Sequence, residues 1–400
     1  MAQAAPGLAS SVPLAQLSYM AAGQSSRLKD VVVKLKEKST TFQVPCSWEF
    51  VKKLGSGAYG SVVSFKDTDT RKIHAVKKIT DAFADVTDGK RILREVKLLQ
   101  QLRHEKIIHI VDVYSPQAPN IEDVYIVTDA MDCNLHQVIY SNSNQLTQDH
   151  HQFLTYQILE GLGYLHGRDV VHRDIKPQNI LVNKECDVKI CDFGLARVLR
   201  TAELEALDQT NYVVTRPYRA PEVVLLQAKY TKSIDVWAVG CILGEQMLRR
   251  PMFYGRDYCD QIQKIIATLG TPSEEELHWL PEDSPGRRFL ARFPAQPKAN
   301  WSSIFPGRSR EAHEAVEAML RLDPVARPTA TEAMRLRFFE GYFKEADVLD
   351  CDPADPVDWT FDSFEPTKSL LQSFMYQECA MFHPELREPR GSRPQVQYVR

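Results

Sequence analysis

Residues 172–179 decide the fold: they read HRDIKPQN, and residues 192–194 follow them with DFG. These segments supply two carboxylates, a cation and an amide, namely Asp174, Asp192, Lys176 and Asn179. Phosphoryl transfer needs a carboxylate that orients and deprotonates a hydroxyl, a cation for developing charge, and oxygen ligands for Mg²⁺. His172 has no second ligand at metal-binding spacing, so we expect it to pack and form hydrogen bonds instead.

A glycine-rich stretch lies upstream at residues 55–62, GSGAYGSV. Glycines let backbone amides approach phosphates because no Cβ intervenes. A glycine-rich hairpin turn or a Rossmann loop gives a similar pattern, but a Rossmann loop leads from a strand into a helix. Residues 61–65, SVVSF, are of β type. We therefore expect the loop to join two strands and to cover a nucleotide as a flap.

Two adjacent lysines occupy the next predicted strand, residues 73–79. Successive side chains of a strand point to opposite faces, so one of Lys77 and Lys78 faces the glycine loop. We assign that role to Lys77 and expect Lys78 to be a solvated surface charge. Residues 90–102 then have apolar side chains at helical spacing, and Glu95 in this helix is the candidate partner of Lys77. An exposed helical glutamate is the alternative for Glu95.

The order of the remaining patterns predicts two parts of different composition. Residues 47 to about 127 are rich in strand patterns, including a hairpin at 61–79 and strands at 107–113 and 124–127. After about residue 131 the patterns become helical, with an apolar helix at 234–248 and a capping box at 329–332. Prolines mark residues 281–306 as rich in loops. We predict an α+β, bilobed fold with a ligand cleft between a small β-rich lobe and a larger helical lobe.

Composition excludes several classes of protein. The 400 residues carry 49 basic and 52 acidic side chains, a balance that does not favour nucleic acid as a partner. No apolar run approaches the roughly 18 residues of a membrane span. Eight scattered cysteines indicate a reducing compartment rather than a disulfide scaffold. The first residues lack the basic region and apolar core of a signal peptide, so we expect a cytoplasmic protein and leave nuclear entry open.

Six motifs occur in the order found in protein kinases: the glycine loop, Lys77, Glu95, HRD, DFG and the APE of residues 220–222. Within that group the chain resembles the mitogen-activated protein kinases. Residues 210–212 resemble the T-x-Y activation lip, and residues 269–273, LGTPS, lie in a segment resembling the family insert. Residues 350–384 resemble the extension that packs back on both lobes, whereas a cyclin-dependent kinase would end soon after 338–339.

The resemblance implies a division of the chain. Residues 1–46 are expected to be a flexible tail, 47–131 the N-lobe and 132–345 the C-lobe, with the insert at about 258–306. Residues 346–400 are expected to form the docking and extension segment.

The resemblance also implies roles at an ATP and Mg²⁺ site. Lys77, held by Glu95, would bind the α- and β-phosphates, and Asn179 and Asp192 would ligate Mg²⁺. Asp174 would act as catalytic base and Lys176 would steady the γ-phosphoryl group, as in serine/threonine kinases. The expected nucleotide-binding residues are Leu54, Gly55, Ser56, Gly57, Ala58, Tyr59, Gly60, Val62, Ala75, Lys77, Thr128, Asp129 and Met131.

A phosphorylation switch is implied as well. Each phosphate adds about −1.5 to −2 charge and three strong acceptors, so it needs an arginine cluster to order a loop. An upstream dual-specificity kinase would phosphorylate Thr210 and Tyr212. The expected phosphate-receiving residues are Arg94, Arg173 and Arg197 for the threonine and Arg216 and Arg219 for the tyrosine. Solvated surface arginines are the alternative.

A docking surface is the last feature that the resemblance implies. Asp352 and Asp355 would form an acidic patch, and His150 and Phe153 would line the adjoining apolar groove. The alternatives are a solvated acidic loop and a core aromatic. The expected partners are protein substrates, the upstream kinase, phosphatases and docking-motif peptides, with no nucleic acid and no membrane, and the chain is expected to be a monomer.

Two residues depart from the family pattern. Asn211 is not one of the usual middle residues of the lip, Glu, Pro or Gly, which leaves the subgroup open. Pro217 replaces an aromatic beside the pocket for the residue that follows the target Ser or Thr, where a preference for proline is expected. A cyclin-dependent-like kinase and a catalytically weak docking scaffold remain as alternatives. Such scaffolds generally lose the lysine, the HRD aspartate or the DFG aspartate, whereas this chain has all three as Lys77, Asp174 and Asp192.

Overall fold

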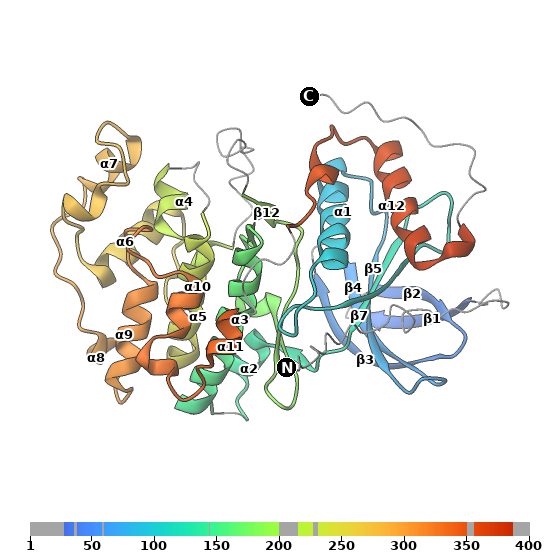
Figure 1. Cartoon of the computed structure of the whole chain (residues 1–400), viewed down its shortest axis with the longest axis horizontal. Coiled ribbons are helices and arrows are strands. Elements are labelled where there is room, and N and C mark those ends of the chain that lie inside the picture. The colour runs from blue at the N-terminus through green and yellow to red at the C-terminus, as the bar shows by residue number, and fades with distance from the viewer. Residues whose placement is uncertain are drawn as a thin grey trace, which may run out of the picture.

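The computed structural model describes residues 28–35, 38–57, 60–143, 145–199, 215–226, 231–349 and 356–386. These residues form a sheet-based N-lobe and a helical C-lobe (Figure 1), which confirms the predicted α+β, bilobed fold. Thr210, Tyr212, Asp352, Asp355 and the loop residues Ala58 and Tyr59 lie outside the described residues.

The N-lobe is built on a five-stranded antiparallel sheet with the strand order β3-β4-β5-β7-β6. Its strands are β3 (Trp48–Gly57), β4 (Gly60–Asp67), β5 (Ile73–Ile79), β6 (Ile110–Tyr114) and β7 (Val124–Asp129). The register sets Val62 of β4 opposite Lys77 of β5, and Ala75 of β5 opposite Thr128 of β7. The glycine loop therefore joins two strands, as predicted, and neighbouring strands bring it beside Lys77.

The predicted tail of residues 1–46 is wrong for residues 28–45, which form an antiparallel hairpin of β1 (Leu28–Leu35) and β2 (Lys38–Pro45). Phe42 and Val44, two residues apart, point to one face of β2 and are fully buried. The Phe42 ring lies 6.0 Å from Phe65 and 6.4 Å from Tyr125. The hairpin thus completes the N-lobe core.

Lys78 is also not the solvated charge that we expected. Its Nζ lies 2.9 Å from the Thr41 carbonyl oxygen and 2.9 Å from an Asp123 carboxylate oxygen. The contact with Asp123 is largely buried. Burial alone lowers the pKa of Lys78, but Asp123 and Tyr125 outweigh it and raise the pKa. Lys78 therefore ties the hairpin to the sheet on the face opposite to Lys77.

Helix α1 (Val86–Gln101) packs against the sheet and confirms the helix predicted at 90–102. Asp85 caps it by accepting hydrogen bonds from the amides of Thr87 and Asp88. A Cβ at Gly89 would lie 2.9 Å from both Leu371 and Phe83, so only glycine permits this close approach to the C-terminal segment.

The C-lobe is mostly helical. Its helices are α2 (Leu135–Tyr140), α3 (Gln148–Gly167), α4 (Pro221–Leu226), α5 (Ser233–Leu248), α6 (Tyr258–Leu269), α7 (Pro285–Leu290), α8 (Trp301–Ile304), α9 (Arg310–Met319), α10 (Ala330–Met334) and α11 (Glu345–Leu349). Short 3₁₀ helices are η2 (Pro177–Asn179), η3 (Arg216–Tyr218), η4 (Glu275–Leu277) and η5 (Arg337–Phe339). The predicted helix at 234–248 and the Thr329 capping box are confirmed in α5 and α10. The loop-rich region 281–306 contains α7 and α8, which proline-based reasoning overlooked.

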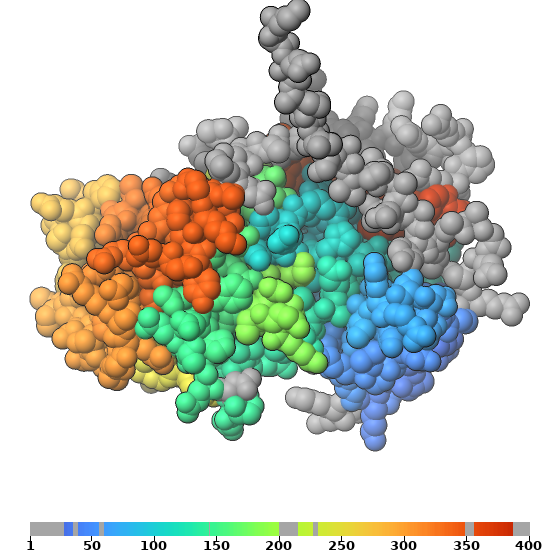
Figure 2. Space-filling view, turned by 60° about the horizontal axis from the view of Figure 1, so that its bottom comes forward, coloured from blue at the N-terminus to red at the C-terminus, as the bar shows by residue number. Residues whose placement is uncertain are grey.

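Short strands lie where the two lobes meet. They are β8 (Cys133–Asn134), β10 (Ile180–Val182) and β11 (Val188–Ile190) in one sheet, and β9 (Val170–Val171) and β12 (Arg197–Val198) in another. In Figure 2 green segments from the middle of the chain lie between the blue N-lobe and the orange part of the C-lobe. None of the described helices is long and apolar enough to cross a membrane.

The C-terminal segment returns from the C-lobe to the N-lobe. Tyr156 of α3 donates a hydrogen bond of 2.8 Å to Asp347 of α11, before η6 (Thr360–Asp362), α12 (Lys368–Phe382) and η7 (Pro384–Leu386) continue the chain. Helix α12 lies beside α1 in Figure 1, and His383 at its end lies 2.8 Å from Asp112 of β6. The described part of this segment therefore contacts both lobes.

Candidate functional site

A buried acid of α5 anchors the segment that carries the candidate base. Both oxygens of Asp235 accept backbone hydrogen bonds of 2.9 Å, one from His172 and one from Arg173, and His166 Nε2 lies 3.0 Å away. Asp235 is 2% exposed. Sequence analysis assigned it no role, although an acid near the start of a mostly apolar helix was a usable signal. It fixes the backbone that leads directly into Asp174.

Asp174 is the centre of a polar cluster. Lys176 Nζ lies 2.5 Å from its Oδ2, and the Thr215 hydroxyl donates to its Oδ1 at 3.1 Å. Lys176 also donates to Thr215 Oγ1 at 3.1 Å. The cation and the candidate base are therefore held together, with Thr215, which sequence analysis left without a role, connecting the two.

Asn179 lies against the same carboxylate. Its Nδ2 donates to the Asp174 backbone oxygen at 2.9 Å and to Asp174 Oδ2 at 3.0 Å. Because the amide nitrogen is used in this way, the side-chain oxygen of Asn179 is left to act as an acceptor. Asp192 supplies a carboxylate two residues after the end of β11, from a backbone with φ of +68°.

The residues present suit Mg²⁺. This ion takes oxygen ligands, keeps several waters, and is usually bound by one or two carboxylates together with substrate phosphates. The Asn179 oxygen and the Asp192 carboxylate are donors of that kind. Among the described residues, no group of three or more His, Cys, Asp or Glu side chains could hold a metal ion.

An ion pair joins the N-lobe sheet to α1. Lys77 Nζ lies 2.7 Å from Glu95 Oε2, with side chains 21% and 10% exposed. Burial alone lowers the pKa of Lys77, but the carboxylates of Glu95 and then Asp192 outweigh it and hold the pKa above its ordinary value. Asp192 therefore lies within electrostatic reach of Lys77, and the contact with Glu95 holds the Lys77 ammonium group in place.

The residues around Asp192 fix its position. Phe193 is fully buried, with its ring 5.0 Å from His172, and His172 Nε2 lies 3.0 Å from the Cys191 carbonyl oxygen. His172 therefore packs and forms hydrogen bonds, as expected. Burial, followed by the charges of Asp192 and Glu95, raises the pKa of Cys191 well above its usual range, so this thiol stays protonated.

The glycines of the loop have different roles. A Cβ at Gly60 would meet the Lys78 carbonyl oxygen at 2.0 Å, so Gly60 allows β4 to approach β5. A Cβ at Gly55 would contact nothing within 4 Å. Gly55 therefore adjoins open space, in which backbone amides can reach a phosphate.

The other expected nucleotide-binding residues come from the two strands that flank this loop, from β5 and β7, and from the connection to the C-lobe. Leu54, Ser56 and Gly57 lie in β3 and Val62 in β4. Thr128 and Asp129 end β7, and Met131 lies in the connection to the C-lobe, 8% exposed. Ala75 and Thr128 pair across neighbouring strands, which places both at the same level of the sheet.

The expected phosphate-receiving arginines form two groups. Arg94 Nη1 donates to the Gly194 carbonyl oxygen at 2.8 Å, and Arg197 pairs in register with Val171, two residues before Arg173. These three arginines are thus linked through the segments around HRD and DFG. Arg94 is already engaged, because its guanidinium also contacts Asp362, a residue that sequence analysis did not single out.

The second group shares one aromatic ring. The guanidinium of Arg219 lies 4.9 Å and that of Arg216 5.7 Å from the centre of the Tyr258 ring. Arg216 Nη1 also donates to the backbone oxygens of Gly255 and Arg256. Both arginines therefore lie against the start of the insert.

The two expected groove residues lie in the first two turns of α3. His150 Nδ1 lies 2.7 Å from Thr147 Oγ1, which caps the helix, and His150 is half-buried. The Phe153 ring lies 5.3 Å from Tyr342 and is also half-buried. Phe153 is therefore not the fully buried core aromatic of the alternative.

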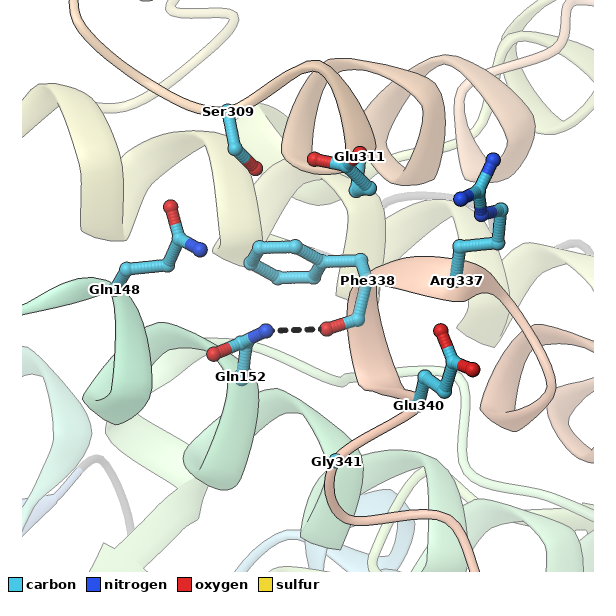
Figure 3. A pocket seen from close by; sticks show the side chains of 8 residues that line it. All are labelled: Gln148, Gln152, Ser309, Glu311, Arg337, Phe338, Glu340 and Gly341. Carbon is cyan, nitrogen blue, oxygen red and sulfur yellow. Dashed lines mark hydrogen bonds between the residues drawn. The ribbon is translucent and has the colours of Figure 1, made fainter.

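A separate pocket opens on the C-lobe (Figure 3). The first two turns of α3 contribute Gln148 and Gln152, and the start of α9 contributes Ser309 and Glu311. The 3₁₀ helix η5 contributes Arg337 and Phe338, with Glu340 and Gly341 beyond it. Gln152 Nε2 donates to the Phe338 backbone oxygen. None of the residues assigned to chemistry lines this pocket.

The comparisons with known proteins agree with this geometry. The family described as "Protein kinase domain" matches residues 48–339. Over 345 residues the chain is 42% identical to extracellular signal-regulated kinase 1 of Dictyostelium discoideum, covering 86% of this chain and 64% of that protein. It is 42% identical to mitogen-activated protein kinase 6 of Arabidopsis thaliana (84% of this chain, 83% of the relative) and 41% identical to mitogen-activated protein kinase 5 of Oryza sativa subsp. indica (84% and 89%).

Proposed function

The chain belongs to the protein kinase family, in its mitogen-activated branch, and from this premise we propose that it transfers the γ-phosphoryl group of ATP to Ser or Thr of protein substrates. The observation that carries the proposal is the convergence of two clusters from different lobes. Arg94, the neighbour of Glu95 on α1, donates to the carbonyl oxygen of Gly194 at 2.8 Å. The amide of Cys191, the neighbour of Asp192, donates to the Asn179 carbonyl oxygen at 3.0 Å.

In the proposed mechanism each group of this chain has one task. Lys77 binds the α- and β-phosphates, and Glu95 holds its ammonium group in place. Asn179 and Asp192 would hold Mg²⁺, which would supply positive charge beside the phosphates. Asp174 orients the substrate hydroxyl and accepts its proton, while Lys176 stabilises charge on the transferred group.

The substrates are proposed to carry proline after the target residue. Pro217 lies in η3 beside Arg216. In the family pattern an aromatic residue fills this position, beside the pocket for the residue that follows the target Ser or Thr. We further propose that the chain works as a cytoplasmic monomer. Its proposed regulators are an upstream dual-specificity kinase and phosphatases, and Asp352, Asp355, His150 and Phe153 are the proposed docking residues.

Activation by phosphorylation of both Thr210 and Tyr212 is part of the proposal. Unmodified protein is expected to have low activity, because the arginine groups lack the phosphates that would order the lip. Phosphorylated wild type should transfer labelled phosphate from ATP to a Ser/Thr-Pro peptide at a much higher rate. The Thr210→Ala, Tyr212→Phe double variant should stay at the rate of unmodified protein after the same treatment.

Mass spectrometry of Thr210 and Tyr212 in the same samples links the rate to the modification. Equal turnover by the double variant and the phosphorylated wild type would refute the switch. A cyclin-dependent-like kinase would instead bind a cyclin stably and be indifferent to Tyr212→Phe, and a docking scaffold would transfer no phosphate in either state.

A further inference from the structure

One face of α1 is bound along its length by the C-terminal segment. The contacts come from Lys90, Arg94, Lys97 and Gln101, whose spacing of four, three and four residues places them on a single helical face. Lys90 Nζ donates to the Phe364 carbonyl oxygen at 3.0 Å, and Lys97 Nζ lies 2.5 Å from Glu378 Oε1. Gln101 exchanges two hydrogen bonds with the Asp358 backbone, of 3.1 and 2.7 Å. We call these four residues and their partners the α1 seam.

The contact between Arg94 and Asp362 is the most buried charged contact of the α1 seam. Arg94 Nε lies 3.1 Å from Asp362 Oδ1, and Nη2 lies 3.0 and 3.1 Å from the two carboxylate oxygens. The side chains are 4% and 13% exposed, and the Trp359 ring lies 5.8 Å from the guanidinium. Such a two-pronged pair fixes geometry as well as charge.

Arg94 also connects this contact to the catalytic site. Its remaining nitrogen, Nη1, donates to the carbonyl oxygen of Gly194, the last residue of DFG. The next residue of α1 is Glu95, the partner of Lys77. A single guanidinium thus joins Asp362, the DFG segment and the turn of α1 that carries Glu95.

We propose that Asp362 is a positioning residue for phosphoryl transfer, because it holds Arg94 and thereby keeps Glu95 and the DFG segment in register with Lys77. This inference rests on the proposed function for its activity readout. Removing the Asp362 charge leaves the buried Arg94 guanidinium without its counter-ion, which is strongly unfavourable. Helix α1 then shifts until water can reach Arg94, and Glu95 moves with it.

The test compares Asp362→Asn with wild type, both unphosphorylated at the lip, so that no phosphothreonine can replace Asp362 as the partner of Arg94. We expect kcat to fall by about 5- to 150-fold, the usual range of coupling between linked sites, with the peptide KM unchanged. Amide hydrogen exchange at residues 92–98 should become faster. Asp362→Glu, which keeps the charge, should recover part of the rate. Since both residues act through one pair, Arg94→Gln combined with Asp362→Asn should be no slower than the slower single variant.

The matched control is Lys368→Met, which removes an exposed ion pair of α12 with Glu122 that does not involve α1. It should leave both kcat and exchange in α1 as in wild type. Folded Asp362→Asn protein with wild-type turnover and wild-type exchange in α1 would overturn the proposal. If the wild type itself transferred no phosphate, the proposed function would fail, whereas the exchange of α1 amides would still decide the role of Asp362.

Discussion

Replacing Asp174 by asparagine is expected to lower kcat by about 10²- to 10⁴-fold, the usual contribution of a positioned general base. Asparagine keeps the shape of the side chain but cannot accept the substrate proton. It also removes the charge that Lys176 contacts at 2.5 Å. Transfer of labelled phosphate to a Ser/Thr-Pro peptide, with ATP binding measured separately, gives the effect on the chemical step.

The matched control for this variant is Asp187→Asn, the same change at an exposed position in the turn between β10 and β11. Asp187 contacts Asn183 within that turn, so turnover should stay at the wild-type level. ATP affinity should be similar in all three proteins, because Asp174 binds no part of the nucleotide in the proposed mechanism. Retention of wild-type turnover by folded Asp174→Asn would exclude the assigned base.

Replacing Lys77 by methionine should lower kcat by about 10²- to 10³-fold, as expected when a group aimed at developing charge is lost. Methionine keeps most of the length and the apolar stem but presents no charge to the phosphates. Glu95 would then face Asp192 without a cation between them, which adds repulsion at the site. Steady-state transfer kinetics with varied ATP measure the loss.

Two further variants make the second prediction specific. Lys77→Met combined with Glu95→Gln should be no slower than Lys77→Met alone, because Glu95 acts only through Lys77. Lys78→Met should keep wild-type turnover but unfold at a lower temperature, since Lys78 ties β2 to the sheet. Equal loss of activity in the Lys77 and Lys78 variants would contradict the assignment of the two faces of β5.

The catalytic motifs were accessible from sequence because their chemistry depends on residue type and short spacing. HRD, DFG, Lys77 and Glu95 needed no knowledge of contacts between distant segments, and strand alternation separated Lys77 from Lys78 correctly. The expectation that Lys78 is a solvated surface charge was wrong, because its partners Thr41 and Asp123 lie far from it in the chain. Local patterns do not report which distant acid a lysine meets.

Three features needed the folded structure. In residues 28–45 the alternation of apolar and polar side chains is short and is limited to the positions around Phe42 and Val44. These two side chains are buried only because the hairpin packs against the sheet. Asp235 stands out in the sequence as an acid in a mostly apolar helix, but its partners cannot be read there, and Asp362 in the C-terminal segment looks like an ordinary acid. Their roles come from long-range contacts with His172 and Arg94, so only the fold reveals them.

The most direct measurement is a crystal structure with Mg²⁺ and a non-hydrolysable ATP analogue. We predict the triphosphate between the glycine loop and Lys77, with Mg²⁺ about 2.0–2.1 Å from oxygens of Asn179 and Asp192. The terminal phosphate should lie next to Lys176 and Asp174. A nucleotide bound elsewhere, or Asp174 and Asp192 in separate pockets with no path between them when the lobes close, would contradict the account.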